Sequence, residues 1–174
     1  MPFTPFHMGP GIFIKAILQG SFSLMVFGWA QIVMDIQPLF VLVSGEGQLH
    51  GFTHTYLGAT LLAIFSTLTG KYLSEYGLLI SGISRRQHII KIAWPIATLS
   101  AFIGTYSHVV LDSLMHADMQ PLYPWLTENE LLGLVSVESI HMFCLLSASA
   151  GAVIYCLIQF IWCKRGKAGN DSND

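Results

Sequence analysis

Four long stretches of the chain contain no Asp, Glu, Lys or Arg, and the charged residues gather between them. The stretches are Ala16 to Met34, Tyr56 to Gly70, Ile92 to Leu111 and Ile140 to Trp162. A helix needs roughly 17 to 25 apolar residues to cross the hydrocarbon core of a bilayer, and the last two stretches reach that length on their own. The pattern therefore predicts an all-α protein, an integral membrane helical bundle with about four hydrophobic spans.

The first apolar stretch can fold in two ways. The alternatives are one span from Phe22 to Val43, or a hairpin of two shorter helices, Gly11 to Gln19 and Phe22 to Met34, that turns at Gly20 and Ser21. One span would place Asp35 in hydrocarbon, where an ionised side chain at a helix centre costs roughly 2.5 to 3.5 kcal/mol. The hairpin is preferred because it returns Asp35 to the face that holds His7. Its arms are short enough to be re-entrant, an arrangement that requires packing against other helices.

The later spans and their loops predict which face is cytoplasmic. The second span is predicted from near His54 to Gly70, the third from Ile92 to Leu114 and the fourth from Ile140 to Trp162. A loop from Lys71 to Lys91 joins the second span to the third, and an acidic connection from Met115 to Ser139 joins the third to the fourth. Every positive charge except Lys15 then falls on one side. Cytoplasmic loops carry an excess of Lys and Arg, so the N-terminus is predicted outside the cytoplasm and the C-terminus inside.

Composition limits the class of protein and its partners. Hydrophobic residues make up 53% of the 174 residues and charged residues only 10%, which is outside the range of ordinary soluble domains. The formal net charge of -2 and the lack of a basic stripe argue against nucleic-acid binding. Membrane lipids are the expected partners. We predict a single membrane-embedded domain over residues 1–167 and a disordered polar tail over residues 168–174.

Two histidine motifs fall on the predicted extracytoplasmic face. His50 and His54 are four residues apart, a spacing that places both imidazoles on one face of a helix, although such a pair can also simply cap a helix at the interface. His108 and Asp112 repeat the spacing inside an apolar helix, and His116 extends the same face by a turn. An ionisable residue in such a helix indicates function, the alternative being that Asp112 only accepts a hydrogen bond from a histidine.

These residue types are ligands for a divalent metal ion. Two neutral imidazoles and a carboxylate suit zinc, carboxylate-rich sites also suit manganese or iron, and a bridging carboxylate would allow a second ion. Asp112 can act both as a ligand and as a catalytic group, because a carboxylate can also take a proton from water. Glu138 and His141 form an i, i+3 pair used by bundle metal sites, so Glu138 is a reserve ligand or base.

Three segments together resemble a known family. They are His-Gly-Phe-Thr-His-Thr at 50–55, Gly-Thr-Tyr-Ser-His-Val-Val-Leu-Asp-Ser-Leu at 104–114 and Pro-Leu-Tyr-Pro-Trp at 121–125. The pattern resembles the YdjM-like family of inner-membrane proteins, to which metal-dependent hydrolysis is ascribed. The residues that match its motifs are His7, Asp35, His50, Thr53, His54, Ser107, His108 and Asp112.

The resemblance implies a set of metal ligands and a reaction class. The implied ligands are His7, Asp35, His50, His54, His108 and Asp112, and Thr53 and Ser107 are expected to hold imidazole nitrogens in place. The chain departs from the family motifs at two positions. Gly51 follows His50 directly where the family has Arg, and Gln37 replaces a second acid, which weakens a two-metal reading. We expect the ligands to converge, with His54 and His108 within about 10 Å, because zinc–nitrogen bonds are only about 2.0 to 2.1 Å.

Three functions are compatible with these residues. The leading hypothesis is a metal-dependent hydrolase of the bacterial inner membrane that acts on a lipid or lipid-linked ester, most plausibly a phosphoester, at the extracytoplasmic face. The second is a metal-ion or proton transporter, which needs polar groups that continue to the opposite face. The third is a haem-binding electron carrier with His54 and His108 as axial ligands, which would leave Asp35 and Asp112 without a role.

Overall fold

The computed structural model describes residues 4–83 and 90–170, and this part of the chain contains helices and no strand. The elements are α1 (Thr4–Leu18), the 3-10 turn η1 (Gln19–Ser21), α2 (Leu24–Ser44), the 3-10 turn η2 (Phe52–His54), α3 (Tyr56–Ile80), α4 (Trp94–Met115) and α5 (Val137–Asn170). The predicted all-α class is confirmed. The predicted tail begins inside α5, and residues 171–174 lie outside the described residues.

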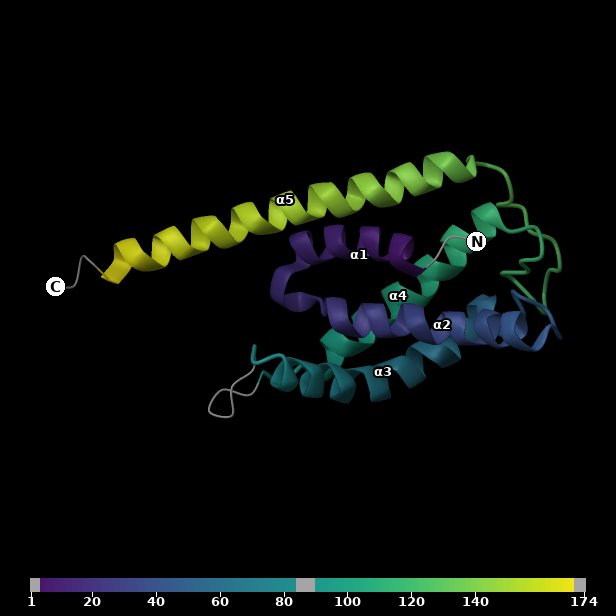
Figure 1. The fold of residues 1–174 in the computed structure, drawn as a ribbon, viewed down its shortest axis with the longest axis horizontal. Helices are drawn as coiled ribbons and strands as arrows, with labels where there is room; N and C mark the ends of the chain where they lie inside the picture. Colours follow the sequence, from purple (N-terminus) through teal and green to yellow (C-terminus); the bar gives the residue numbers. More distant parts are fainter. Residues whose placement is uncertain (1–3, 84–89, 171–174) are drawn as a thin grey trace.

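The helices run along one another, so the bundle has two distinct ends (Figure 1). Helices α2, α3 and α4 pack together, and α1 lies between them and α5, with which it makes its most extensive contact. Helices α1, α3 and α5 begin at one end, where α2 and α4 finish. We call this the histidine end, because it carries the 45–55 and 116–136 connections with His50, His54 and His116.

The N-terminal segment forms a hairpin, as preferred, but its second arm is nearly the single span from Phe22 to Val43 that was the alternative. Its turn is η1, at the predicted Gly20 and Ser21. Lys15 donates hydrogen bonds of 2.6 Å and 2.8 Å to the carbonyls of Gln19 and Phe22. Its charge, the one that the sequence did not place with the other positive charges, therefore lies at the end opposite the histidine end. Both arms are longer than predicted. Helix α2 continues past Met34 to Ser44 and ends at Gly45, whose positive φ of 74° favours glycine.

The position of Asp35 therefore differs from the prediction. The prediction ended the helix at Met34, before this acid. In the structure Asp35 lies within α2, which continues beyond it. Its carboxylate faces the bundle interior and lies 3.3 Å from the imidazole of His108. An acid in an apolar helix is tolerated where it pairs with a partner inside the bundle, which the sequence pattern alone could not supply.

Two of the helices are long and apolar enough to cross a membrane, counting only the described residues. They are α2 (Leu24–Ser44) and the Val137–Lys164 part of α5. Four spans are therefore not confirmed. Helices α3 and α4 fall short because they carry polar residues, and several of these are buried between helices, including Ser66, Thr67, Lys71, Ser100, Thr105 and His108.

The predicted Lys71 to Lys91 loop is wrong in its first ten residues, which belong to α3. Lys71 is buried and pairs with Glu75 one turn later, and Glu75 also accepts a hydrogen bond of 2.8 Å from the backbone of Ile92. This pairing lets the helix continue through two charged residues. Arg85 and Arg86, on which the predicted topology partly rests, lie outside the described residues.

Candidate metal centre

Asp112 lies among four imidazole rings at the histidine end of α4. Its carboxylate oxygens are 3.4 Å from Nε2 of His7, 3.6 Å from Nε2 of His54, 3.1 Å from Nε2 of His108 and 3.9 Å from Nε2 of His116. The side chain of Asp112 is only 5% exposed, so bulk water does not separate these groups. Helices α1 and α4 and the turn η2 all contribute to this cluster.

The six predicted metal ligands converge, as expected. The imidazole rings of His54 and His108 are 5.3 Å apart between centroids, and those of His7 and His108 are 4.5 Å apart. Ligand atoms from His7, His108 and Asp112 lie within 4.8 Å of one another, and so do those of Asp35, His54 and His108. His50 joins at the edge, with its ring centroid 5.1 Å from that of His54. Their convergence is established, and their role as ligands stays a prediction.

The two histidine motifs have different local structures where they join the cluster. His108 and Asp112 are one turn apart on α4, as the spacing predicts. His50 and His54 are not on an α-helix, because His50 lies in a turn and His54 in η2. Helix α3 starts only at Tyr56, where the Thr55 hydroxyl accepts a 2.9 Å hydrogen bond from the backbone of Gly58. Thr is a preferred N-cap residue, so Thr55 indicates that the helix starts after it. The spacing of His50 and His54 suggested a helix that starts earlier.

Several buried imidazole nitrogens in the cluster have no hydrogen-bond partner. They are both ring nitrogens of His7, and Nε2 of His54 and of His108. Burying a polar atom without a partner costs free energy, so such atoms call for a shared proton, a water molecule or an ion. Nitrogen lone pairs next to a carboxylate are the donor set that zinc prefers. The residues present therefore fit a divalent cation.

Gln31 fixes the orientation of His108. Nε2 of Gln31 donates a 3.0 Å hydrogen bond to the carbonyl of Gly104, so its Oε1 faces Nδ1 of His108 at 2.6 Å. An amide oxygen only accepts, so Nδ1 of His108 is the donor and carries a proton. In the neutral ring, Nε2 then points a lone pair at the carboxylates of Asp112 and Asp35. That contact is favourable only when a proton or a cation lies between the groups.

The sequence analysis missed Gln31, although a signal was present. It is a fully buried amide in an apolar helix, one turn before Asp35 on the same face. Ser107, predicted to hold an imidazole directly, instead contacts Gln31, whose Nε2 is 3.4 Å from its hydroxyl. Thr53 acts as predicted, since its hydroxyl lies 3.0 Å from Nδ1 of His54.

The two departures from the family motifs fit each other in space. Oε1 of Gln37 accepts a hydrogen bond from the hydroxyl of Thr53 and a 3.3 Å bond from its backbone. A Cβ atom at Gly51 would lie 2.2 Å from Nε2 of Gln37, so a larger residue there would displace this amide from its present position. Gln37 thus holds the segment that carries His54, in place of the second acid of the family motif.

The His50 side chain also contacts a residue that the prediction omitted. Its Nδ1 lies 2.9 Å from both carboxylate oxygens of Asp118, in the loop after α4. Partial burial, the largest single effect, raises the pKa of Asp118, but the hydrogen bond and charge of His50 together with backbone hydrogen bonds outweigh it and hold the pKa of this carboxyl below its usual value. Burial lowers the pKa of His116, and the nearby His50 lowers it further, so a neutral imidazole is favoured there.

Glu138 and His141 occupy the start of α5. Glu138 is exposed in the first turn and belongs to none of the groups of possible metal ligands among the described residues. The ring of His141 lies 4.9 Å from that of Phe6, and its buried Nε2 has no partner. The catalytic role of Glu138 stays a prediction.

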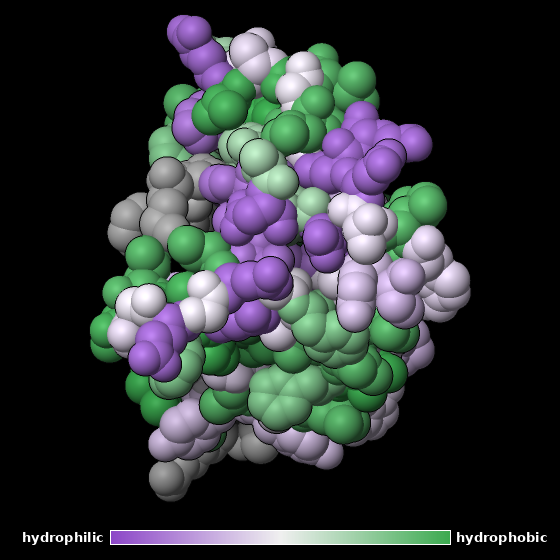
Figure 2. Space-filling model, turned by 90° about the vertical axis from the view of Figure 1, so that its right-hand side faces the viewer, coloured by the Kyte–Doolittle hydropathy of each residue, from purple (hydrophilic) through white to green (hydrophobic). Residues whose placement is uncertain are grey.

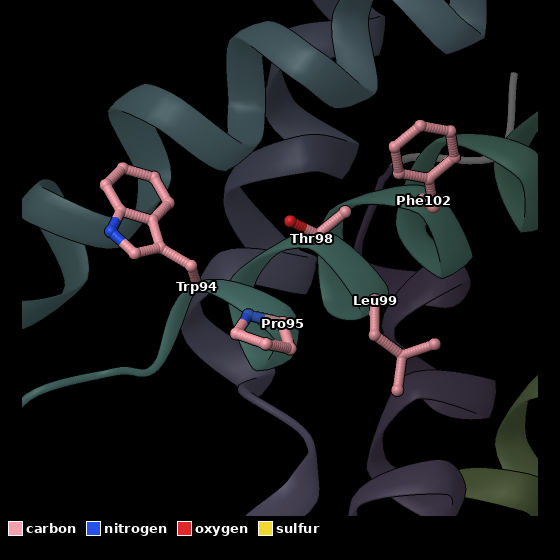
Figure 3. A pocket seen from close by; sticks show the side chains of 5 residues that line it. All are labelled: Trp94, Pro95, Thr98, Leu99 and Phe102. Atoms are coloured by element: carbon pink, nitrogen blue, oxygen red, sulfur yellow. The ribbon is translucent and has the colours of Figure 1, made fainter.

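One pocket lies away from the cluster, at the other end of α4 (Figure 3). It is lined by Trp94, Pro95, Thr98, Leu99 and Phe102. Its polar groups are the hydroxyl of Thr98 and the indole N–H of Trp94. The pocket therefore offers none of the imidazole or carboxylate ligands that gather at the histidine end.

Comparison with known proteins identifies the family of the chain. No curated protein and no solved structure matches it. Residues 14–168 match the family described as YdjM inner membrane protein. This segment includes Asp35, His54, His108 and Asp112, while His7 precedes it and joins the cluster through its contact with Asp112. The match covers most of the chain and agrees with the sequence motifs, so this protein belongs to the YdjM inner membrane protein family.

Proposed function

We propose that this protein is a metal-dependent hydrolase that acts on a lipid or lipid-linked phosphoester at the extracytoplasmic face of the inner membrane. The observation that carries the proposal is the Asp112 carboxylate, buried among imidazoles whose facing nitrogens lack a hydrogen-bond partner. Without an ion, these nitrogens would need protons to share with the carboxylates. A divalent cation beside Asp112 is bound through their lone pairs instead.

The residues of the cluster would have different roles in the reaction. His7 and His108 would hold the ion together with Asp112, since their ligand atoms lie within 4.8 Å of one another, and His54 lies 3.6 Å from Asp112. Zinc fits this set best, and manganese or iron are alternatives. When bound, such an ion lowers the pKa of water to about 7 and polarises a phosphoryl oxygen. Asp112 would bind the ion or accept the proton of the attacking water. Asp35, a third exposed, lies where the cluster meets the surface.

The surroundings of the cluster favour a lipid substrate. The face at the histidine end shows hydrophilic residues across its middle, between hydrophobic ones (Figure 2). On α2, the exposed side chains of Ile32, Ile36 and Leu39 flank Asp35. A phosphate group could reach the polar residues while its acyl or prenyl chain stays against this apolar surface.

The two other functions fit the geometry less well. Haem needs room for its macrocycle between two axial imidazoles, but the rings of His54 and His108 are only 5.3 Å apart. A transporter needs free polar groups toward the opposite end. There, the hydroxyls of Thr67 and Ser100 donate to carbonyls of their own helices, at 2.8 Å and 2.7 Å, and the buried hydroxyl of Ser66 is the one without a partner among these three.

A chelator experiment tests the hydrolase. The purified protein in liposomes should release phosphate or alcohol from at least one member of a panel of phospholipids and polyprenyl phosphates. EDTA should abolish the release, because the proposed reaction needs the ion to lower the pKa of the attacking water and to polarise the phosphoryl oxygen, and added zinc or manganese should restore it. Hydrolysis that continues in EDTA would overturn the proposal, as would haem absorbance in the purified protein.

The extracytoplasmic position of the site is tested by labelling. In a cysteine-free background, Glu128→Cys lies at the histidine end and Ser81→Cys at the opposite end, both exposed. A membrane-impermeant maleimide should label Glu128→Cys in intact cells and Ser81→Cys only after permeabilisation, because the basic residues favour the cytoplasm. The reverse pattern would place the site on the cytoplasmic face.

A further inference from the structure

We propose that His50, His116 and Asp118 form a second divalent-cation site at the rim of the histidine end. The proposal goes beyond the hydrolytic function, which needs only the ion at Asp112. It also assigns Nδ1 of His50 to this second site. Asp118 belongs to neither family motif, and the sequence analysis did not single it out.

The ligand atoms of the three side chains lie close together. Ligand atoms of His50, His116 and Asp118 lie within 4.8 Å of one another. The rings of His50 and His116 are stacked, with centroids 4.3 Å apart, and Nδ1 of His50 is 2.9 Å from Asp118. Two ligands of a tetrahedral zinc ion, each about 2.0 Å from it, are about 3.3 Å apart. A small opening of the contact between His50 and Asp118 would therefore admit an ion.

The backbone around the site is held in place. The side chain of Asn129 donates hydrogen bonds of 2.8 Å and 3.3 Å to the carbonyls of Ser113 and His116. Tyr56 donates a 2.8 Å backbone bond to Pro121, and Met119 is buried between His116 and this anchor. The three ligands thus come from two connections that are fixed to the helices, and they are not a chance meeting of loose surface side chains.

Exposure rises across the site from the interior to the solvent. The side chains are 8% exposed at His50, 21% at His116 and 51% at Asp118. Three protein ligands with a solvent-facing side leave a coordination position for water, as in metal sites that exchange ligands. The site borders the first cluster, since Nε2 of His116 is 3.9 Å from Asp112. If the proposed hydrolysis is right, an ion here would hold a phosphoryl oxygen of the substrate.

A second arrangement of the same residues makes a different prediction. Asp118 could act only as a positioning residue that accepts Nδ1–H of His50, while the other nitrogen of His50 binds the ion at Asp112. His116 would then bind no metal. The number of bound ions, and its dependence on His116, separates the two arrangements.

Metal counting on the whole protein tests the proposal without any substrate. Metal-free protein in detergent is titrated with Co²⁺, followed by its visible absorption, and bound zinc is counted by mass spectrometry after zinc loading. We expect two ions in the wild-type protein and in Glu130→Gln, an exposed acid in the same loop. His116→Gln and Asp118→Asn should each retain one ion, and the retained ion also shows that the variant has folded.

The outcomes are distinct. One ion in the wild-type protein, or two ions that persist in both variants, would overturn the second site. Two bound ions in a protein that hydrolyses nothing would support the second site and contradict the proposed function. Chelator-sensitive hydrolysis by a protein with one bound ion would support the proposed function and contradict the second site. Mn²⁺ provides an independent check, because two neighbouring ions show coupled electron paramagnetic resonance signals that His116→Gln should abolish.

Discussion

Asp112→Asn should keep the helical bundle and lower the hydrolysis of the best lipid phosphoester by roughly 10²- to 10⁴-fold, the usual contribution of a positioned acid or base. The substitution preserves the shape of a side chain that is 5% exposed. It removes the negative charge that faces the imidazoles of His7, His54 and His108. An amide is a poor metal ligand and cannot take a proton from water, so both proposed roles are lost together.

The matched control is Glu130→Gln, the same carboxylate-to-amide change at an exposed position of the 116–136 connection. It should leave turnover unchanged. Helical circular dichroism and gel filtration show whether Asp112→Asn keeps its fold. Wild-type turnover by Asp112→Asn would remove this residue from the mechanism. Loss of metal flux into liposomes, in a protein that hydrolyses nothing, would point to the transporter instead.

Local spacing predicted those parts of the site that lie on one helix. The four-residue interval between His108 and Asp112 is one turn of α4, and their contact of 3.1 Å follows from helix geometry. The joint location of His7 and Asp35 followed from the hairpin, because a turn at Gly20 and Ser21 returns the chain to the end where it began. Each of these inferences needed only the register along one or two elements.

Contacts between distant elements could not be predicted in this way. Gln31 reaches His108 because of how α2 and α4 are rotated about their axes, and Asp118 reaches His50 because the loop after α4 folds back over the site. Neither rotation nor loop path is encoded in local spacing. Charge-free runs also misplaced the end of the helix that was predicted to start near His54, because Lys71 and Glu75 neutralise each other within α3.

His108→Ala should remove the metal from the Asp112 cluster, and Gln31→Leu should weaken its binding by roughly 10- to 100-fold. Removing the ring deletes the nitrogen that lies 3.1 Å from Asp112 and 3.3 Å from Asp35. Gln31→Leu keeps the ring but deletes the acceptor 2.6 Å from its Nδ1. The ring is then free to rotate and to carry its proton on Nε2, where the metal should bind.

Competition with a chelator of known affinity measures both effects in detergent-purified protein. Gln159→Leu is the control, because it makes the same change in a half-buried amide at the other end of the bundle, where Gln159 contacts Gln19. Its metal affinity should equal that of the wild type. If Gln31→Leu bound metal as tightly, helix α4 alone would orient His108. If His108→Ala did so, His108 would not be a ligand of the ion.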